Sequence, residues 1–340
     1  MSKYGFLDDY SEGCHPNILE AIASTNLIQQ IAYGNDEYTN QAKSLISKHF
    51  NQNDIDIHFV AGGTLANIIC IASMLKPYEA IISASSGHIA LREAGAIEAT
   101  GHKIITVASE DGKLTTDSIK DAIKNNSHAP HMAKPKLVYI SNTTEMGTVY
   151  TKVELQKISA ICKANDLLLF MDGARLGAAL TASDNDLTLA DIAELTDMFW
   201  IGGTKSGMLF GEAIVIPNKK LAKDFAFNIK QRGALLAKGR VLGLQFRELF
   251  SNNLFFDLAS HANKMAEKLS SGIVKAGYKL IQPTQSNQIF VALPNDVIKF
   301  LQEKFTFFVM SEIDEQNSMV RLVTSWATDE IMVDGFVSDI

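Results

Sequence analysis

Short apolar runs alternate with amphipathic stretches over roughly residues 15–245 of the chain. The apolar runs end in polar or glycine residues and have the length of buried β-strands. They cover residues 55–64, 79–85, 102–108, 136–142, 167–173, 197–204 and 211–217. Between them, apolar residues recur at helical spacing in residues 15–28, 40–50, 64–75 and 153–165. This alternation predicts an α/β fold with a mostly parallel sheet and helices on both faces, in which ligands bind at the carboxyl ends of the strands.

The pattern changes after about residue 250, which indicates a smaller α+β domain at the C-terminal end. A helical stretch precedes three strand-like runs, and a last helix follows them; these elements cover residues 255–277, 288–294, 305–312, 319–326 and 328–339. We therefore expect an N-terminal segment over residues 1–14, a large domain over 15–248 and a C-terminal domain over 249–340.

Composition narrows the class of protein. A net charge of −7 gives no reason to expect nucleic acid or an anionic membrane as a partner. No segment approaches the roughly 20 apolar residues that span a bilayer, and the first residues lack the pattern of an export signal. The three cysteines are far apart and His128 and His131 lie in a proline-containing loop, so we expect no bound metal. These features favour a cytoplasmic protein with reduced thiols.

Lys205 lies in the stretch GGTKSG, with small residues on both sides of a long cationic side chain. A phosphate-binding Walker A loop would need glycine at the position of Thr204, and no G-x-G-x-x-G follows a strand. A tight turn with an outward lysine remains one interpretation. The other is that the glycines let the lysine backbone come close to a bound ligand.

Asp172 ends another apolar run, in LLLFMDGAR, at a predicted strand end. Such an aspartate could simply cap a helix. Together with Lys205 on a later strand end, however, it matches what pyridoxal phosphate (PLP) chemistry requires. The lysine forms the Schiff base, and the carboxylate keeps the pyridine nitrogen protonated.

Eight motifs of the chain occur in the order found in the threonine aldolase and β-eliminating lyase family. They are NDEYT, GGT, GHIALREAGAIEATGH, SNTTEMGT, FMDGARLGAAL, FWIGGTKSG, GEAIVI and MVRLVTSW. The chain resembles this family from about residue 5 to 326. The resemblance implies the aspartate aminotransferase-like fold (fold type I) and a PLP-dependent lyase. The reaction it implies is aldol cleavage of L-threonine or L-allo-threonine to glycine and an aldehyde. The alternative within the class is β-elimination or transamination of another small amino acid.

The resemblance also implies roles for individual residues. Lys205 would form the Schiff base, Asp172 would bind the pyridinium nitrogen, His88 would stack on the ring and Arg321 would bind the substrate carboxylate. Arg175 would reach the cofactor and help to hold the substrate. The phosphate would be bound by Gly63, Thr64, Thr204 and Arg240, with Arg232 as the alternative to Arg240.

The chain departs from the family pattern at two places. Thr144 stands where many threonine aldolases have a histidine, and LDDYSEG replaces an R-S-D-T segment, so that Ser11 would have to supply the serine. Tyr33 resembles a tyrosine that reaches a neighbouring subunit's site, which implies a homo-oligomer, dimer or tetramer, with shared active sites. Two other classes stay open: an NAD- or nucleotide-dependent α/β enzyme, and a binding protein without activity.

Overall fold

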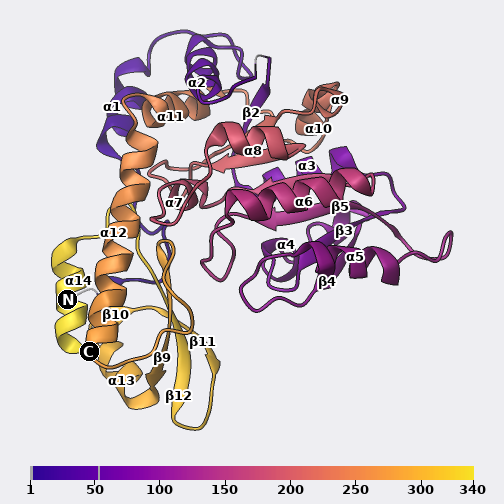
Figure 1. Ribbon diagram of the computed structural model, residues 1–340. Coiled ribbons are helices and arrows are strands. Elements are labelled where there is room, and N and C mark those ends of the chain that lie inside the picture. The colour runs from indigo at the N-terminus through magenta and orange to yellow at the C-terminus, as the bar shows by residue number, and fades with distance from the viewer. Residues whose placement is uncertain (1–2, 53) are drawn as a thin grey trace.

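A computed structural model describes residues 3–52 and 54–340 (Figure 1). Its centre is a seven-stranded sheet with the order β2-β8-β7-β6-β5-β3-β4. All neighbouring strands are parallel except that β8 runs antiparallel to β2 and β7. The strands are β2 (Asp56–Val60), β3 (Glu79–Ala84), β4 (Lys103–Val107), β5 (Lys134–Ser141), β6 (Leu168–Asp172), β7 (Met198–Gly202) and β8 (Glu212–Ile216). The mostly parallel α/β sheet is thus confirmed.

Helices cover both faces of this sheet, because successive side chains of a strand point to opposite sides. In β3, Ala80 and Ile82 belong to one buried apolar cluster and Ile81 to another. The first cluster also contains residues of several helices. Among these helices are α1 (Pro16–Thr25), α2 (Glu37–Ser47), α5 (Thr116–Asn125), α6 (Lys152–Ala164), α7 (Leu176–Leu180), α8 (Leu189–Leu195) and α11 (Arg240–Phe250). Residues of α3 (Gly63–Met74), α4 (His88–Leu91), α9 (Lys219–Ala222) and α10 (Phe225–Gln231) complete or pack against the second.

Local capping signals determine where some of the helices begin. At the start of α6, the Thr151 hydroxyl accepts a hydrogen bond from the Glu154 backbone N–H at 3.3 Å, and the Glu154 carboxylate accepts one from the Thr151 N–H at 2.8 Å. This capping box starts a helix that crosses from β5 to β6. Such a crossover allows the two strands to lie parallel, with their carboxyl ends at the same edge.

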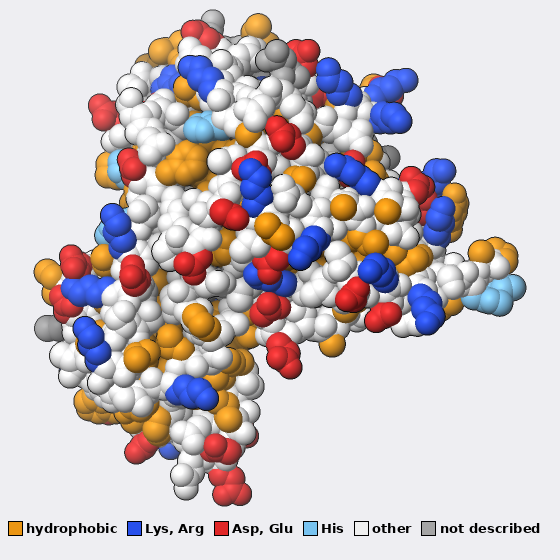
Figure 2. Space-filling model, viewed as in Figure 1, with side chains coloured by type: hydrophobic (Ala, Val, Ile, Leu, Met, Phe, Trp, Pro, Cys, Tyr) orange, Lys and Arg blue, Asp and Glu red, His pale blue; other side chains and the backbone are white. Residues whose placement is uncertain are grey.

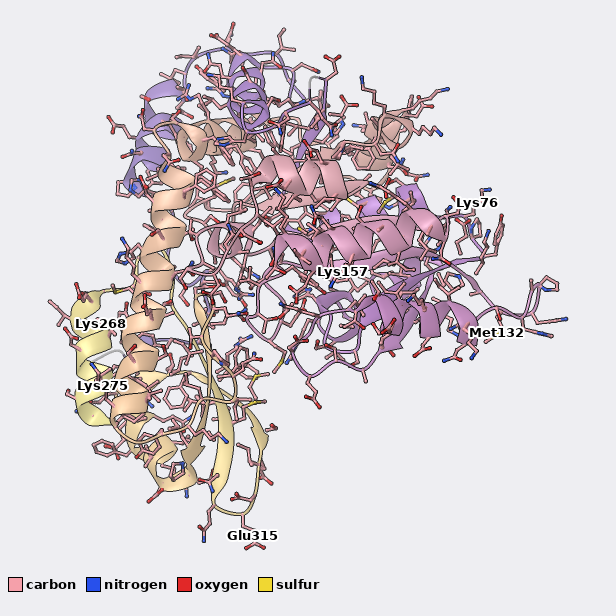
Figure 3. All side chains as sticks on the ribbon, in the orientation of Figure 1. Lys76, Met132, Lys157, Lys268, Lys275 and Glu315 are labelled. Atoms are coloured by element: carbon pink, nitrogen blue, oxygen red, sulfur yellow. The ribbon has the colours of Figure 1, made fainter. Side chains whose placement is uncertain are left out.

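The C-terminal part has its own antiparallel sheet, with the order β11-β12-β9, and its own apolar cluster. Its elements are α12 (Leu254–Lys275), β9 (Gln288–Pro294), α13 (Asn295–Leu301), β10 (Phe305–Thr306), β11 (Phe308–Glu312), β12 (Asn317–Val323) and α14 (Glu330–Asp339). The strand predicted over 305–312 forms two strands, because β10 pairs with β1 (Tyr4–Gly5) and β11 pairs with β12. Lys268 of α12, labelled in Figure 3, binds Glu330 and Asp334 of α14 at 2.7 and 2.6 Å.

Helix α12 runs along both parts of the molecule (Figure 1). Phe255 and Leu258 near its start belong to the first cluster of the large sheet, whereas Leu269 and Ile273 belong to the C-terminal cluster. The predicted boundary between residues 248 and 249 thus lies just before a continuous helix that packs against both parts of the molecule. The boundary itself stays a prediction. Residues 1–2 of the predicted N-terminal segment and residue 53 of the predicted large domain lie outside the described residues.

Within the described residues, no helix is both long and apolar enough to cross a membrane. On the face seen in Figure 2, basic and acidic side chains are interspersed rather than gathered into one basic patch. The three cysteines, Cys14, Cys70 and Cys162, are buried free thiols.

Candidate active site

A cavity of about 350 Å³ opens at the edge of the large sheet where β2, β6 and β7 end and β8 begins. Parallel strands deliver their carboxyl ends to the same edge, so residues far apart in the chain meet there. The lining includes seven of the predicted site residues, namely Gly63, Thr64, His88, Asp172, Arg175, Thr204 and Lys205.

Asp172 is the last residue of β6, and its buried carboxylate accepts three hydrogen bonds. Oδ2 accepts from Tyr139 Oη at 2.7 Å and from Asn67 Nδ2 at 3.0 Å, while Oδ1 accepts from the Ala174 backbone N–H at 3.0 Å. These bonds compensate for removing a charged group from water and fix the direction of the carboxylate.

A chain of buried polar groups links Asp172 to His88. Asn67 also donates to Glu93 Oε1 at 2.7 Å, and His88 Nδ1 lies 2.8 Å from the same oxygen. The Nδ1 atom therefore carries the hydrogen, and Nε2 is the nitrogen that can accept a proton. The His88 backbone N–H donates to Glu145 Oε1 at 2.9 Å, which anchors the start of α4.

Lys205 lies in the loop that joins β7 to β8, and its side chain reaches the cavity. Burial lowers the pKa of Lys205, and the charge of Arg175 lowers it further. The ammonium nitrogen lies 5.8 Å from the centre of the Tyr10 ring, which also lines the cavity. An amine with a lowered pKa is a better nucleophile near neutral pH, because more of it is unprotonated.

Two carboxyl groups on the lining differ in how they are compensated. Glu212 accepts hydrogen bonds from the Gly203 N–H at 3.0 Å and from Thr204 Oγ1 at 2.8 Å, yet burial raises its pKa to about 8. Burial likewise raises the pKa of Glu145, although Ser141 Oγ donates to it at 2.7 Å. Hydrogen bonds alone therefore do not offset the loss of water around these two acids.

Arg175 is held by an aspartate of the N-terminal segment. Its Nε and Nη2 atoms donate to the two carboxylate oxygens of the buried Asp9 at 2.7 and 3.0 Å, and Asn287 Nδ2 donates to Asp9 at 2.9 Å. Burial acts to lower the pKa of Arg175, but the Asp9 charge outweighs it and the pKa is raised. The two hydrogen bonds to Asp9 thus fix the Arg175 guanidinium beside Lys205 and leave Nη1 for a ligand.

Two predicted residues do not line the cavity. Arg321 lies against the Phe308 ring at 5.4 Å, and its Nη2 is 3.5 Å from the Leu7 carbonyl oxygen. Arg240, at the start of α11, donates to the backbone carbonyls of Thr25, at 2.6 Å, and of Ile28. The alternative, Arg232, binds the neighbouring Gln231 side chain at 3.2 Å. The roles of Arg321 and Arg240 stay predictions.

The atypical positions also have definite places. Thr144 lines the cavity, but its hydroxyl is bonded to the Asp111 carbonyl at 3.0 Å and to Thr148 Oγ1 at 2.7 Å. Ser11 donates to Asp8 at 2.8 Å instead of entering the cavity, and Tyr33 lies on the surface beneath Lys230. Within this chain, neither Ser11 nor Tyr33 lines the site.

Sequence reasoning assigned no role to several polar residues at or next to the cavity, among them Asp9, Asn67, Glu93, Tyr139, Glu145 and Glu212. Asn67 is the polar residue inside the apolar helix TLANIICIASM, and Glu212 heads the apolar strand EAIVI. A buried polar group within an apolar run needs a partner, and this is the signal that would have identified both residues.

Among the described residues, no group of three or more His, Cys, Asp or Glu side chains could hold a metal ion. The rings of His128 and His131 stack with their centres 5.0 Å apart in the loop between α5 and β5. Met132 of the same loop lies far out from the sheet in Figure 3.

Comparison with known proteins places these features in a family. The family model of the beta-eliminating lyases matches residues 8–295. The low specificity L-threonine aldolase of Pseudomonas sp. (strain NCIMB 10558) is 35% identical to the chain, over 98% of this chain and 95% of that protein.

Solved structures agree with this placement. The threonine aldolase of Leishmania major superposes with a TM-score of 0.97 at 49% identity, covering 98% of both chains. A double mutant of Thermus thermophilus aspartate aminotransferase superposes with a TM-score of 0.71 at 12% identity, over 99% of this chain and 90% of that one. The second likeness concerns the fold alone, and it confirms the predicted aminotransferase-like fold.

Proposed function

Since the chain belongs to the beta-eliminating lyase family, we propose that it is a PLP-dependent lyase that cleaves L-threonine or L-allo-threonine to glycine and an aldehyde. The observation that carries the proposal is that Lys205 and Asp172, from different strand ends, line one cavity. The near full-length similarity to proteins named threonine aldolase supports the choice of reaction.

The residues of the cavity fit PLP. Lys205 supplies an amine of lowered pKa and Asp172 a fixed carboxylate. At Gly63, the first residue of α3, a Cβ atom would make a tight contact of 3.0 Å with the Trp200 ring. No side chain caps the N-terminus of this 12-residue helix, which leaves its first N–H groups available to a phosphate. An amine, a carboxylate and a phosphate cradle are the donor set that this cofactor needs.

Each residue then has a defined task. Lys205 Nζ would bind the aldehyde group of the cofactor, and Asp172 would keep the ring nitrogen protonated. Gly63, Thr64 and Thr204 would bind the phosphate, and His88 would stack on the pyridine ring. When bound, PLP supplies the electron sink that stabilises negative charge on the substrate Cα.

The substrate carboxylate is held by Arg175 and Arg321. Asp9 already occupies Nε and Nη2 of Arg175, so Nη1 faces the substrate. Arg321 does not line the cavity, but its Nε is buried without a hydrogen-bond partner among the described residues, and this free donor supports its assignment to the carboxylate. The two guanidinium groups thereby fix which Cα bond is broken.

His88 is the base for the β-hydroxyl group. Its Nε2 takes the hydroxyl proton as the Cα–Cβ bond breaks and the hydroxyl carbon becomes the aldehyde carbonyl. Glu93, 2.8 Å from Nδ1, stabilises the resulting imidazolium. Thr144 does not serve, because its hydroxyl is bonded to Asp111 and Thr148.

Visible absorbance tests cofactor binding. The purified protein should be yellow, borohydride should shift the visible band, and Lys205→Ala should remove it together with at least about 10³-fold of the activity. Lys163→Ala, on α6, is the control and should keep both. A colourless protein that PLP cannot reconstitute would contradict the proposal.

Product analysis tests the reaction itself. Glycine and acetaldehyde from threonine indicate aldol cleavage, whereas pyruvate from serine or cysteine would indicate β-elimination. An oxo acid formed from an amino acid would indicate transamination. The assembly into a dimer or tetramer with shared sites and the location in the cytoplasm are further parts of this proposal, for which size-exclusion chromatography with light scattering and cell fractionation are the direct measurements.

A further inference from the structure

Glu212 reaches the active site because β8 runs against its neighbours. It is the first residue of β8 and pairs with Gly202 at the carboxyl end of β7 and with Val60 at the carboxyl end of β2. A strand in the common direction would place its first residue at the opposite edge of the sheet. The reversal therefore inserts an acid between the Lys205 loop and the turn before α3.

The Glu212 carboxyl is buried, at 4% exposure, and forms no ion pair within the described residues. Its two oxygens accept from the Gly203 N–H and from Thr204 Oγ1. The charged groups that face it are Lys205, on the loop, and Asp172, at the end of β6. Burial raises its pKa to about 8, so the acid changes charge within the range in which enzymes operate.

The Thr204 hydroxyl has its hydrogen-bonding capacity divided between two neighbours. It donates to Glu212 Oε1 at 2.8 Å and accepts from the Gly211 N–H at 3.0 Å. A hydroxyl has a single hydrogen. While Glu212 is ionised, Thr204 therefore has no hydrogen left for an anion in the cavity.

We propose that Glu212, in alkaline solution where it is ionised, takes up one proton when a phosphate ester binds beside Thr204, and that this proton reverses the hydrogen bond between the two side chains. The inference rests on the proposed function. Solvent supplies the proton, the carboxylate becomes a carboxylic acid, and no other covalent bond changes. Oε1–H then donates to Thr204 Oγ1, and the hydroxyl hydrogen turns to the phosphate.

The reversal satisfies every group involved. Thr204 Oγ1 accepts from Glu212 and from Gly211 and donates to the phosphate, while Oε2 keeps its bond from Gly203. Protonation also removes a negative charge that faces the bound anion. Binding of the phosphate and protonation of Glu212 therefore favour each other, as linkage requires.

Glutamine at position 212 imitates the protonated acid, because its amide donates on one side and accepts on the other. The ligand for the test is pyridoxine 5′-phosphate, which has an alcohol in place of the aldehyde and cannot bond to Lys205. Titration calorimetry on the full chain freed of cofactor, at pH 9 in two buffers of different ionisation enthalpy, counts the protons taken up.

We expect the wild type to take up close to one proton more than Glu212→Gln. From pH 8 to pH 9 the wild-type Kd should also rise by up to about fivefold relative to that of the variant. Thr204→Ser should behave as the wild type, and Thr204→Val should lose the extra proton. Equal uptake by the wild type and Glu212→Gln, with both binding the ligand, would overturn the inference alone.

A second comparison uses two ligands on the wild-type protein and so does not depend on whether a variant folds. Unphosphorylated pyridoxine has the same ring, so the wild type should take up the extra proton only with the phosphorylated ligand. Equal proton counts for the two ligands would also overturn the inference. Failure of the wild type to bind pyridoxine 5′-phosphate at any pH would instead contradict the proposed function, and this inference with it.

Discussion

Buried charge at individual residues decides how this site is built. Burial acts to raise the pKa of Asp9, but the charges of Arg175 and Lys205 and the hydrogen bonds from Arg175 and Asn287 hold it below its ordinary value. Glu212 lacks a comparable cation in contact, so its pKa moves the other way. The pKa values of these two buried acids are thus shifted in opposite directions because their partners differ.

Replacing Asp9 by asparagine should leave Arg175 buried without its counter-charge. We expect the free energy of unfolding to fall by about 3–5 kcal/mol at pH 7, measured by urea denaturation. Asp9 has a lowered pKa in the folded state, so its contribution is present above its ordinary pKa of 3.8. It is lost as the pH falls through the lower folded value, and the difference between the two proteins should shrink there.

The neighbouring Asp8→Asn variant is the matched control. Asp8 is only partly buried and binds the Tyr10 N–H and the Ser11 hydroxyl. Its loss should cost less than about 1 kcal/mol. An Asp9→Asn protein as stable as Asp8→Asn would show that Asp9 and Arg175 do not stabilise the fold as a pair.

Among the elements, the close approach of β6 and β7 depends on the glycine after β6. A Cβ atom at Gly173 would lie 1.8 Å from the Trp200 carbonyl oxygen, and the Gly202 N–H donates to the Gly173 carbonyl at 2.9 Å. Because the clash would be with a backbone atom, no flexible side chain could move away to relieve it. The glycine therefore keeps the ends of the strands that carry Asp172 and Lys205 close together.

Gly173→Ala should separate these strand ends and lower the free energy of unfolding by at least about 3 kcal/mol, with loss of cofactor binding. Chemical denaturation and visible absorbance would measure the two effects. Gly335→Ala in α14 is the control, because nothing lies within 4 Å of a Cβ there and alanine favours the helix. If the two variants proved equally stable, Gly173 would not be needed for the strand spacing.

The sequence predicted elements whose pattern is local. The apolar run ending at Asp172 and the run before Lys205 were identified as strands, and β6 and β7 confirm them. The pattern could single out Asn67 as a polar residue in an apolar run but could not name its partner, because its bond to Asp172 joins residues 105 positions apart. Arg240 was predicted to bind the phosphate, but its place in the sequence could not show that its side chain binds backbone carbonyl groups.

At the scale of the whole molecule, the N-terminal segment belongs to the C-terminal part. β1 pairs with β10, and Phe6 lies in the C-terminal cluster between Phe305 and Phe336, with ring centres 5.9 and 5.5 Å away. Three residues later, Asp9 binds Arg175, which lines the active-site cavity. The segment thereby connects the smaller sheet to the edge of the larger one.

Phe6→Ala should lower the free energy of unfolding by about 3–5 kcal/mol, because it leaves a cavity among aromatic rings. Leu7→Ala should cost less than about 1 kcal/mol, since Leu7 is 37% exposed and Phe6 is 0% exposed. Thermal and urea unfolding of both variants would measure the difference. Similar losses for the two would mean that the segment is only loosely attached.

The route of the N-terminal segment has a consequence for synthesis on the ribosome. Asp9 is made early, but Asn287 and the strand that pairs with β1 are among the last parts of the chain to emerge. A nascent chain that already contains Lys205 and the whole large sheet still lacks the partners that fix Asp9 and, through it, Arg175. Translation must therefore be almost finished before the enzyme can hold its substrate, and fragments released earlier would carry the lysine in an incomplete site.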